Sequence, residues 1–176
     1  MSMRYNRLTS AGVLILALAA PVVGNADPVK NLGVAGRALT FMENGPSGSA
    51  VLGVVFDPSK PGSVAEKNAI MGALGGGFSA GAVTLTGKAI EASEVGGASG
   101  VAALYVTGGV SYGAVGAAAR ARHLVTVGSD PACVNSGACV MGVSTDPKVD
   151  IIVNRAAAAA VGVAFKAAFR MMIHEV

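Results

Sequence analysis

The sequence predicts one α/β domain with a Rossmann-like or flavodoxin-like layered fold, in which a mostly parallel sheet ends in an antiparallel C-terminal hairpin and a closing C-terminal helix. A length of 176 residues leaves room for a single packed core. Short Val-rich runs alternate with helical patterns, as in parallel strands joined by right-handed crossovers. The composition of 52% apolar residues, 13% charged residues and 25 glycines suits buried strands joined by tight turns.

The N-terminal segment, residues 1–26, has the pattern of a secretory signal peptide. Two arginines form a basic start, an apolar run covers residues 8–23, and Gly24-Asn25-Ala26 places small residues before a cleavage point. The run is shorter than the roughly 20 residues that span hydrocarbon, which favours cleavage over the alternative, an uncleaved membrane anchor. We therefore expect an exported, periplasmic protein whose folded domain comprises residues 27–176.

The charge balance argues against a nucleic-acid partner. Removing residues 1–26 takes away Arg4, Arg7 and no acid, so the net charge falls from +3 to +1, with 11 basic residues against 10 acidic ones. No stretch interleaves Lys or Arg with aromatic residues, as a nucleic-acid groove would. No other run approaches the length of a membrane span, so after signal cleavage the protein is not expected to span a membrane.

The first half of the domain alternates helices and strands. Apolar spacing predicts a helix over residues 28–42, and the continuous Val-rich run 49–56 suits a strand that is buried on both faces. A second helix is expected over residues 64–74, with Ser63 or a neighbouring residue as its N-cap. The next predicted elements are strands at 82–86 with 89–90 and at 101–107, a helix at 114–122 and a strand at 123–127.

The C-terminal third predicts an antiparallel edge hairpin and a long helix. Residues 140–144 and 149–153 flank Thr145-Asp146-Pro147-Lys148, which has hairpin-turn chemistry. Asn154 is a natural N-cap for the Ala-rich helix that follows. The apolar face of that helix would comprise Val161, Phe165, Phe169, Met172 and Ile173, which predicts packing against the core.

The two cysteines predict a disulfide. Cys133 and Cys139 enclose a short loop that contains Ser and Gly, and an oxidising compartment would hold them as a local structural clip, with a redox-responsive role as the alternative. Their spacing does not match zinc-binding patterns, so a zinc site with His123 and His174 is not expected. No P-loop or dinucleotide fingerprint is present, and we expect no cofactor.

Two matches to G-x-S-x-G raise the alternative of a small serine esterase. The match at residues 77–81 lies between a predicted helix and a predicted strand, the reverse of a nucleophile elbow. The match at residues 109–113 follows a strand and opens a helix, with Ser111 as the nucleophile and His174 as the base. The acid would be Asp130, Asp146 or Asp150. Too few residues follow residue 113 for that fold, so catalytic residues are not expected.

A non-catalytic ligand pocket is the stronger alternative. Open parallel sheets bind ligands beyond the carboxyl ends of their strands. The polar residues expected at that edge are Asp57, Ser59, Thr107, Ser111 and Ser129. Small polar residues are also ordinary constituents of turns that end strands, so this pocket is a hypothesis with a purely structural alternative. The carboxylates of the chain are scattered singly and are interpreted as solvated surface.

The chain resembles the YfiR family of small periplasmic proteins in three places. Residues 101–107, the helix after them and residues 123–129 are similar to the family's strand, helix and strand ending in Ser. Residues 135–143 resemble its Gly-rich step into a hairpin, and residues 148–154 with the Ala-rich helix resemble its closing signature of strand, Asn and amphipathic helix. The first predicted helix and the strand at 49–56 fit the same order of elements.

The resemblance implies a non-enzymatic periplasmic regulator that tends to dimerise. In the family, the regulator binds and represses the periplasmic sensor part of an inner-membrane diguanylate cyclase, in cyclic-di-GMP signalling, and cysteine oxidation affects it. Cys133 and Cys139 match the family's C-terminal disulfide, whereas its second cysteine pair and its Trp-Pro after the first helix have no counterpart here. Repression of a membrane sensor is thus the main functional expectation, ahead of a small-molecule-binding module and an esterase.

Overall fold

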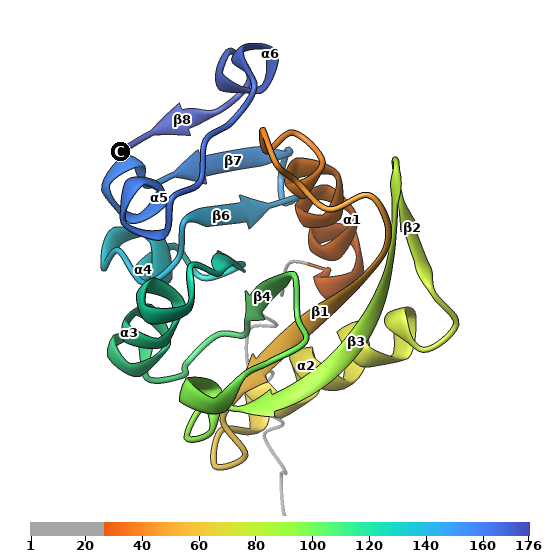
Figure 1. The fold of residues 1–176 in the computed structure, drawn as a ribbon. Helices are drawn as coiled ribbons and strands as arrows, with labels where there is room; N and C mark the ends of the chain where they lie inside the picture. The colour runs from red at the N-terminus through yellow and green to blue at the C-terminus, as the bar shows by residue number, and fades with distance from the viewer. Residues whose placement is uncertain (1–26) are drawn as a thin grey trace, which may run out of the picture.

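A computed structural model describes residues 27–176, which form one α/β domain around an eight-stranded sheet (Figure 1). The strands are β1 (Gly48–Phe56), β2 (Phe78–Ala80), β3 (Val83–Glu91), β4 (Ala103–Val106), β5 (Val125–Gly128), β6 (Met141–Ser144), β7 (Asp150–Val153) and β8 (His174–Glu175). Their order is β2-β3-β1-β4-β5-β6-β7-β8. Strands β3, β1, β4, β5 and β6 run parallel, and β2 and β7 are antiparallel to β3 and β6. The predicted fold class is confirmed. The predicted signal peptide lies outside the described residues.

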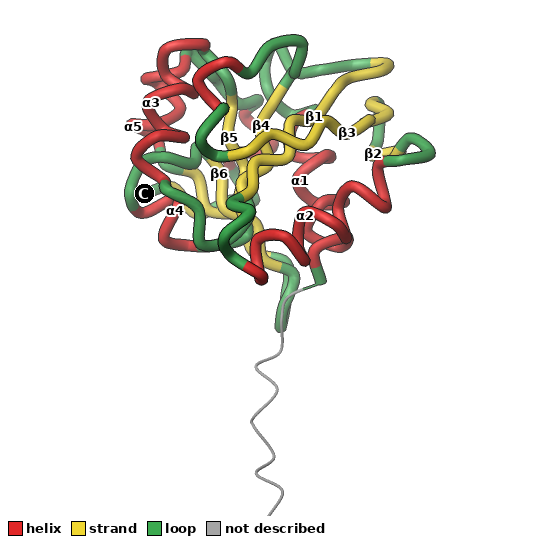
Figure 2. The backbone as a smooth tube through the Cα atoms, turned by 90° about the horizontal axis from the view of Figure 1, so that it is seen from below, coloured by secondary structure: helices red, strands yellow, loops and turns green. Residues whose placement is uncertain are grey.

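Helices cover both sides of the sheet, so the fold has layers. The helices are α1 (Pro28–Leu39), α2 (Pro61–Leu74), η1 (Val95–Gly97), α3 (Tyr112–Arg122), α4 (Pro131–Asn135), α5 (Arg155–Val161) and α6 (Ala167–Arg170). Figure 2 shows α1 and α2 on one side of the sheet and α3 and α4 on the other. No helix within residues 27–176 is long and apolar enough to cross a membrane.

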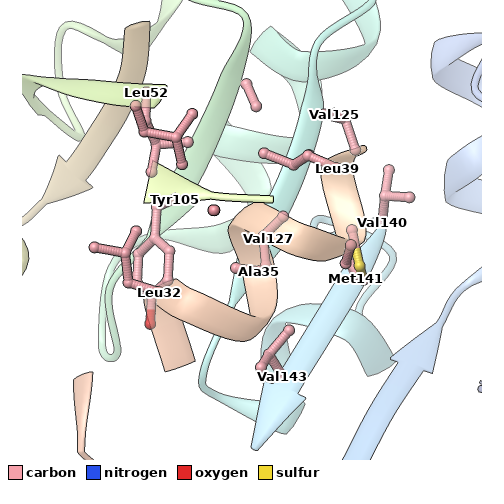
Figure 3. Packing of buried hydrophobic residues seen from close by; sticks show 14 of the residues in the cluster. Leu32, Ala35, Leu39, Leu52, Tyr105, Val125, Val127, Val140, Met141 and Val143 are labelled. Carbon is pink, nitrogen blue, oxygen red and sulfur yellow. The ribbon is translucent and has the colours of Figure 1, made fainter. Parts of the chain in front are cut away.

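The larger apolar cluster lies between the sheet and helices α1 and α2. Figure 3 shows Leu32 and Leu39 of α1 gathered with Tyr105 and Val127 of the central strands, and each of these side chains is at most 1% exposed. Burying an aliphatic or aromatic side chain of this size stabilises the fold by roughly 1.5–3 kcal/mol. The cluster therefore fixes α1 and α2 on the central strands.

The predicted disulfide is present and buried. The Sγ atoms of Cys133 and Cys139 are 2.06 Å apart, and both residues are 0% exposed. Cys133 lies in α4 and Cys139 lies just before β6, within the second apolar cluster on the α3 and α4 side of the sheet. The bond ties α4 to the start of β6, and its burial supports the structural role over the redox-responsive one.

The predicted closing helix is wrong in its length. Asn154 caps α5 as expected, because its Oδ1 accepts a hydrogen bond from the N–H of Ala157 at 2.9 Å. The helix ends at Val161, where Gly162 adopts a left-handed conformation with φ +75°. The chain then turns back through α6 to pair β8 with β7. The left-handed glycine and the strand pairing override the helical propensity of the alanines.

Two further strands were not predicted, and one of them changes the position of the C-terminal hairpin. β8 pairs with β7, so the β6–β7 hairpin lies inside the sheet rather than at its edge. β2 forms the opposite edge through a tight connection to β3. With three and two residues, these strands are too short to show the alternation that identifies a strand in a sequence.

Two glycines test the role of the left-handed helix end. Gly162→Ala is expected to destabilise the protein by about 1 kcal/mol, because alanine is strained at φ +75° even though nothing lies within 4 Å of the added Cβ. Gly72→Ala, an exposed position inside α2 with equally open surroundings, is expected to stabilise by roughly 0.5–1 kcal/mol. Chemical denaturation measures both changes. If Gly162→Ala stabilised the protein as much as Gly72→Ala does, α5 would continue past Gly162.

Candidate functional site

The candidate site lies at the carboxyl ends of the central parallel strands. β1 ends at Phe56, β4 at Val106 and β5 at Gly128. Helix α2 begins at Pro61, shortly after β1, so its first two turns lie beside these strand ends. The turns supply two polar side chains, Ser63 and Glu66, that reach the residues following β4 and β5. We call this region the carboxyl edge.

Glu66 is the centre of the carboxyl edge. Its Oε1 accepts hydrogen bonds from the hydroxyl of Ser129 at 2.6 Å and from that of Tyr105 at 3.2 Å, and its Oε2 accepts one from the backbone N–H of Gly108 at 2.8 Å. The side chain is half-buried. Hydrogen bonds to a charged acceptor are the stronger kind, so this carboxylate joins α2 to the ends of both β4 and β5.

A second network lies next to Glu66 and links β1 to β4. The hydroxyls of Ser63 and Thr107 are 2.6 Å apart, and the Thr107 hydroxyl also donates to the carbonyl of Val55 at 3.0 Å. The Ser63 hydroxyl accepts the N–H of Asp57 at 2.9 Å. Both Ser63 and Thr107 are buried. Ser63, the named candidate for the N-cap, is not the cap: the helix begins after Lys60, and the Ser63 hydroxyl bonds instead to the residues that follow β1 and β4.

A third network joins the turns after β4 and β5. The hydroxyl of Tyr112 donates to Oδ2 of Asp130 and accepts the N–H of Gly109. Burial, with the Asp130 hydrogen bond second, raises the pKa of Tyr112 to about 12. Burial also raises the pKa of Tyr105 well above its ordinary value, and the charge of Glu66 adds to that effect. Both tyrosines are therefore neutral hydrogen-bond donors at physiological pH.

A small slot opens at the same edge, between β5 and the β6–β7 hairpin. It has a cavity volume of about 30 Å³, and Ser129, Val134, Ser144, Asp150 and Ile152 are among the residues that line it. Ser129 belongs to both the slot and the Glu66 network. The volume accommodates about one water molecule, so a larger ligand would lie across the edge rather than inside it.

The structure brings some of the predicted pocket residues together. Thr107 and Asp57 are joined through Ser63, and Ser129 bonds to the neighbouring Glu66. Ser59 is exposed and donates its hydroxyl and N–H to Asp57, which holds the pKa of that carboxyl below its ordinary value. Ser111 is also exposed, and as the first residue before α3 it makes no capping hydrogen bond with its side chain.

The esterase triad is not assembled. Ser111 follows β4, whereas His174 lies in β8 and contacts Oδ1 of Asp150 at 3.3 Å. β4 and β8 have β5, β6 and β7 between them, which separates them by about 19 Å across the sheet. Ser111 also has ordinary extended backbone angles, φ −73° and ψ 94°, rather than those of a strained elbow. Within residues 27–176, no group of three or more His, Cys, Asp or Glu could hold a metal ion.

Glu66 is not among the residues predicted from the sequence, because an isolated carboxylate on a helix is ordinarily solvated surface. One signal was available: Ser63 and Glu66 are three residues apart, so they share one face of a helix, and that helix directly follows β1. In a parallel crossover, the start of such a helix lies at the carboxyl edge. The hydrogen-bond partners of Glu66, which are up to 63 residues away, are not visible in any local pattern.

Comparison with known proteins gives a fold but no family. No family model matches the sequence, and no curated protein matches it either. One similar solved structure is a conserved domain protein from Vibrio cholerae O1 biovar El Tor, with 12% identity and a TM-score of 0.59. A second is a substrate-binding protein with adhesive properties from Clostridium difficile in its ligand-free, open form, with 15% identity and a TM-score of 0.60. A third is an ABC domain in complex with L-Trp from Streptococcus pneumoniae, with 11% identity and a TM-score of 0.61.

The likeness covers most of this chain but only part of each neighbour. Between 84% and 85% of this chain is matched, against 59% to 60% of the other chains. The domain therefore shares its fold with part of each of these three proteins, one of which is a substrate-binding protein. At these identities the comparison concerns the fold alone.

Removal of the Glu66 carboxylate tests its role at the edge. Glu66→Ala leaves the Tyr105 and Ser129 hydroxyls and the Gly108 N–H without their acceptor, and we expect it to lower the free energy of unfolding by about 2–3 kcal/mol. Glu94→Ala, which removes an exposed carboxylate that makes no side-chain capping bond, should change it by less than about 0.5 kcal/mol. Urea denaturation measures both. Equal losses would contradict the role of Glu66.

Alkaline titration tests the environment of Tyr105 and Tyr112, the tyrosines of residues 27–176. Because both pKa values are raised in the folded state, their contribution to stability is complete below the unfolded value of about 10 and is lost as the pH rises through the folded values. Phenolate absorbance should therefore stay low up to about pH 11 in the folded protein and rise near pH 10 in denaturant. Ionisation of both residues near pH 10 in the folded protein would refute the assignment.

Proposed function

We propose that the protein is a non-enzymatic, extracytoplasmic module that binds a small polar molecule at the carboxyl edge. The observation that carries the proposal is the Glu66 network, which gathers a carboxylate, hydroxyls and a backbone N–H at the edge where open parallel sheets bind ligands. Two proteins that share the fold, a substrate-binding protein and a domain in complex with L-Trp, support the choice of a binding function over catalysis.

Two observations support an extracytoplasmic location. The buried Cys133–Cys139 disulfide is of the kind that persists in oxidising compartments. The signal-peptide pattern of residues 1–26 is the second. In this proposal residues 27–176 are the exported domain.

The position of the ligand follows from the shape of the edge. Ser129 is half-buried, and its hydroxyl bonds to Glu66 while the residue lines the slot. A small apolar group of the ligand in the slot would therefore contact Ser129, and a polar group of the same ligand would reach the turns. The exposed Ser59 and Ser111 lie in the turns after β1 and β4 and offer further hydroxyl groups. A ligand with several polar groups and a short apolar part fits these features.

A thermal-shift screen with amino acids, organic acids, amines and sugars tests the proposal. A ligand present at 100 times its Kd stabilises the folded state by about 2.7 kcal/mol, which corresponds to a rise of roughly 5–11 °C in Tm for a domain of this size. Ser129→Ala should reduce that rise, whereas Thr86→Ala, on the exposed face of β3, should leave it unchanged. If no compound class raises Tm, or if both variants respond equally, a ligand site at the carboxyl edge is rejected.

A second candidate function is repression of a membrane sensor protein, such as a diguanylate cyclase. It is favoured by the resemblance to the YfiR family, two of whose features have counterparts in the structure: the disulfide before the hairpin and the strand, Asn and helix at β7, Asn154 and α5. In this function the domain would bind the periplasmic part of the sensor, alone or as a dimer.

Gentle crosslinking of the exported protein followed by purification distinguishes the second candidate. A regulator should be recovered with an inner-membrane sensor protein, and its deletion should raise cyclic-di-GMP. Recovery of the protein alone, with unchanged cyclic-di-GMP, would exclude this function and leave the binding module unaffected.

A further inference from the structure

A second hollow lies away from the Glu66 network, over the exposed side of α1. Figure 1 shows α1 between β2 and the β6–β7 hairpin. The hollow has a cavity volume of about 390 Å³, within the usual range for small-molecule sites. Its main lining residues are Lys30, Val34 and Arg37 of α1, Phe78 of β2, and Thr145 and Val149 of the β6–β7 turn. We call it the α1 groove.

The charged residues that line the α1 groove are both basic. Lys30 and Arg37 are seven residues apart on α1, which places them on the same face of the helix, two turns from each other. Lys30 makes an exposed 3.8 Å ion pair with Asp27, an interaction that contributes little in water. Among the described residues, Arg37 makes no ion pair. The groove therefore presents net positive charge.

The space between the two cations is bordered by apolar side chains from three elements. Val34 of α1 and Phe78 of β2 are half-buried, and Val149 is 60% exposed. Val149 is one of the most exposed large apolar residues of residues 27–176. A ligand body that covered these three side chains would remove apolar surface from water, and this provides a favourable free energy of binding.

An incompletely bonded amide lies behind the wall of the groove. Asn31 is 1% exposed; its Oδ1 accepts the hydroxyl of Thr145 at 2.8 Å, and within residues 27–176 its Nδ2 has no hydrogen-bond partner. Buried polar groups usually have a partner. Thr145, the one side chain bonded to this amide, is itself part of the groove lining. The unpaired Nδ2 of Asn31 therefore lies behind Thr145 and outside the lining of the groove.

We propose that the α1 groove binds a small amphiphilic anion, an organic carboxylate, sulfonate or phosphate with an aromatic or aliphatic body. The acidic group lies between Lys30 and Arg37, and the body covers Val34, Phe78 and Val149. The proposal does not depend on the function proposed for the carboxyl edge. The two sites nonetheless share the β6–β7 hairpin, since Ser144 and Asp150 line the slot while their neighbours Thr145 and Val149 line the groove.

Fluorescence titration with anilinonaphthalene sulfonate tests the groove, because this probe is an aromatic anion. The wild type is expected to bind one equivalent saturably and to bind uncharged phenylnaphthylamine at least about tenfold more weakly. Arg37→Glu should weaken binding of the sulfonate at least about tenfold. Lys60→Glu makes the same change of charge at the carboxyl edge and should leave the affinity within about twofold, as should Glu66→Gln.

A steric pair of variants tests the same site independently of charge. In Gly33→Leu the added Cβ would lie 3.7 Å from Cζ of Phe78, an ordinary contact, so the larger side chain fills the groove without a backbone clash. It should weaken probe binding at least about tenfold, whereas Gly72→Leu on the open face of α2 should not. If decanoate displaces the probe, the groove accepts a ligand with an aliphatic body. If only aromatic acids displace it, the groove requires an aromatic body.

Several outcomes overturn the proposal. These are no saturable binding by the wild type, equal affinity for the charged and uncharged probes, or equal losses in Arg37→Glu and Lys60→Glu. Circular dichroism and Tm values close to those of the wild type establish that each variant is folded. If Gly33→Leu does not fold, the Arg37→Glu and Lys60→Glu pair still decides. The carboxyl edge is tested separately by the thermal-shift screen with Ser129→Ala, so failure of the groove and failure of the carboxyl edge give different results.

Discussion

The carboxylate of Glu66 is the interaction on which the carboxyl edge of this domain depends. It accepts hydrogen bonds from the side chain of β4, from the turn after β4 and from the residue after β5, and so holds one helix against two strand ends. The apolar cluster packs α2 against the sheet, but apolar contacts are non-directional and do not orient the turns at the strand ends. Three donors that converge on one carboxylate supply that direction, because each donor left unpaired would cost free energy. The turns that could hold a ligand are positioned as a result.

The β6–β7 hairpin connects this edge to the opposite side of the molecule. Ser144 and Asp150, at the ends of its two strands, line the slot, whereas Thr145 and Val149, in its turn, line the α1 groove. The hairpin is held inside the sheet by β8 on one side and by β5 on the other. A ligand that moved its turn in one hollow would therefore alter the wall of the other.

The sequence predicted the elements whose residues carry a local pattern. Continuous Val-rich runs identified β1, β4 and β5, and the turn around Asp146-Pro147 identified the hairpin. What it could not predict depends on contacts between distant residues. The helix α5 after Asn154 ends at Val161 because the chain returns to pair with β7, and Ser63 bonds to Thr107 rather than capping its helix. Glu66 looked like a surface acid for the same reason, since its three partners come from other elements.

Hydrogen exchange at the amide of Gly108 tests the role of Glu66 most directly. Within residues 27–176 this N–H bonds only to the Glu66 carboxylate, whereas the amide of the preceding Thr107 bonds to the carbonyl of Val55 and serves as an internal reference. Both amides should be protected in the wild type, and in Glu66→Ala protection should be lost at Gly108 but retained at Thr107. An unprotected Gly108 amide in the wild type, or parallel changes at both amides in the variant, would contradict the account.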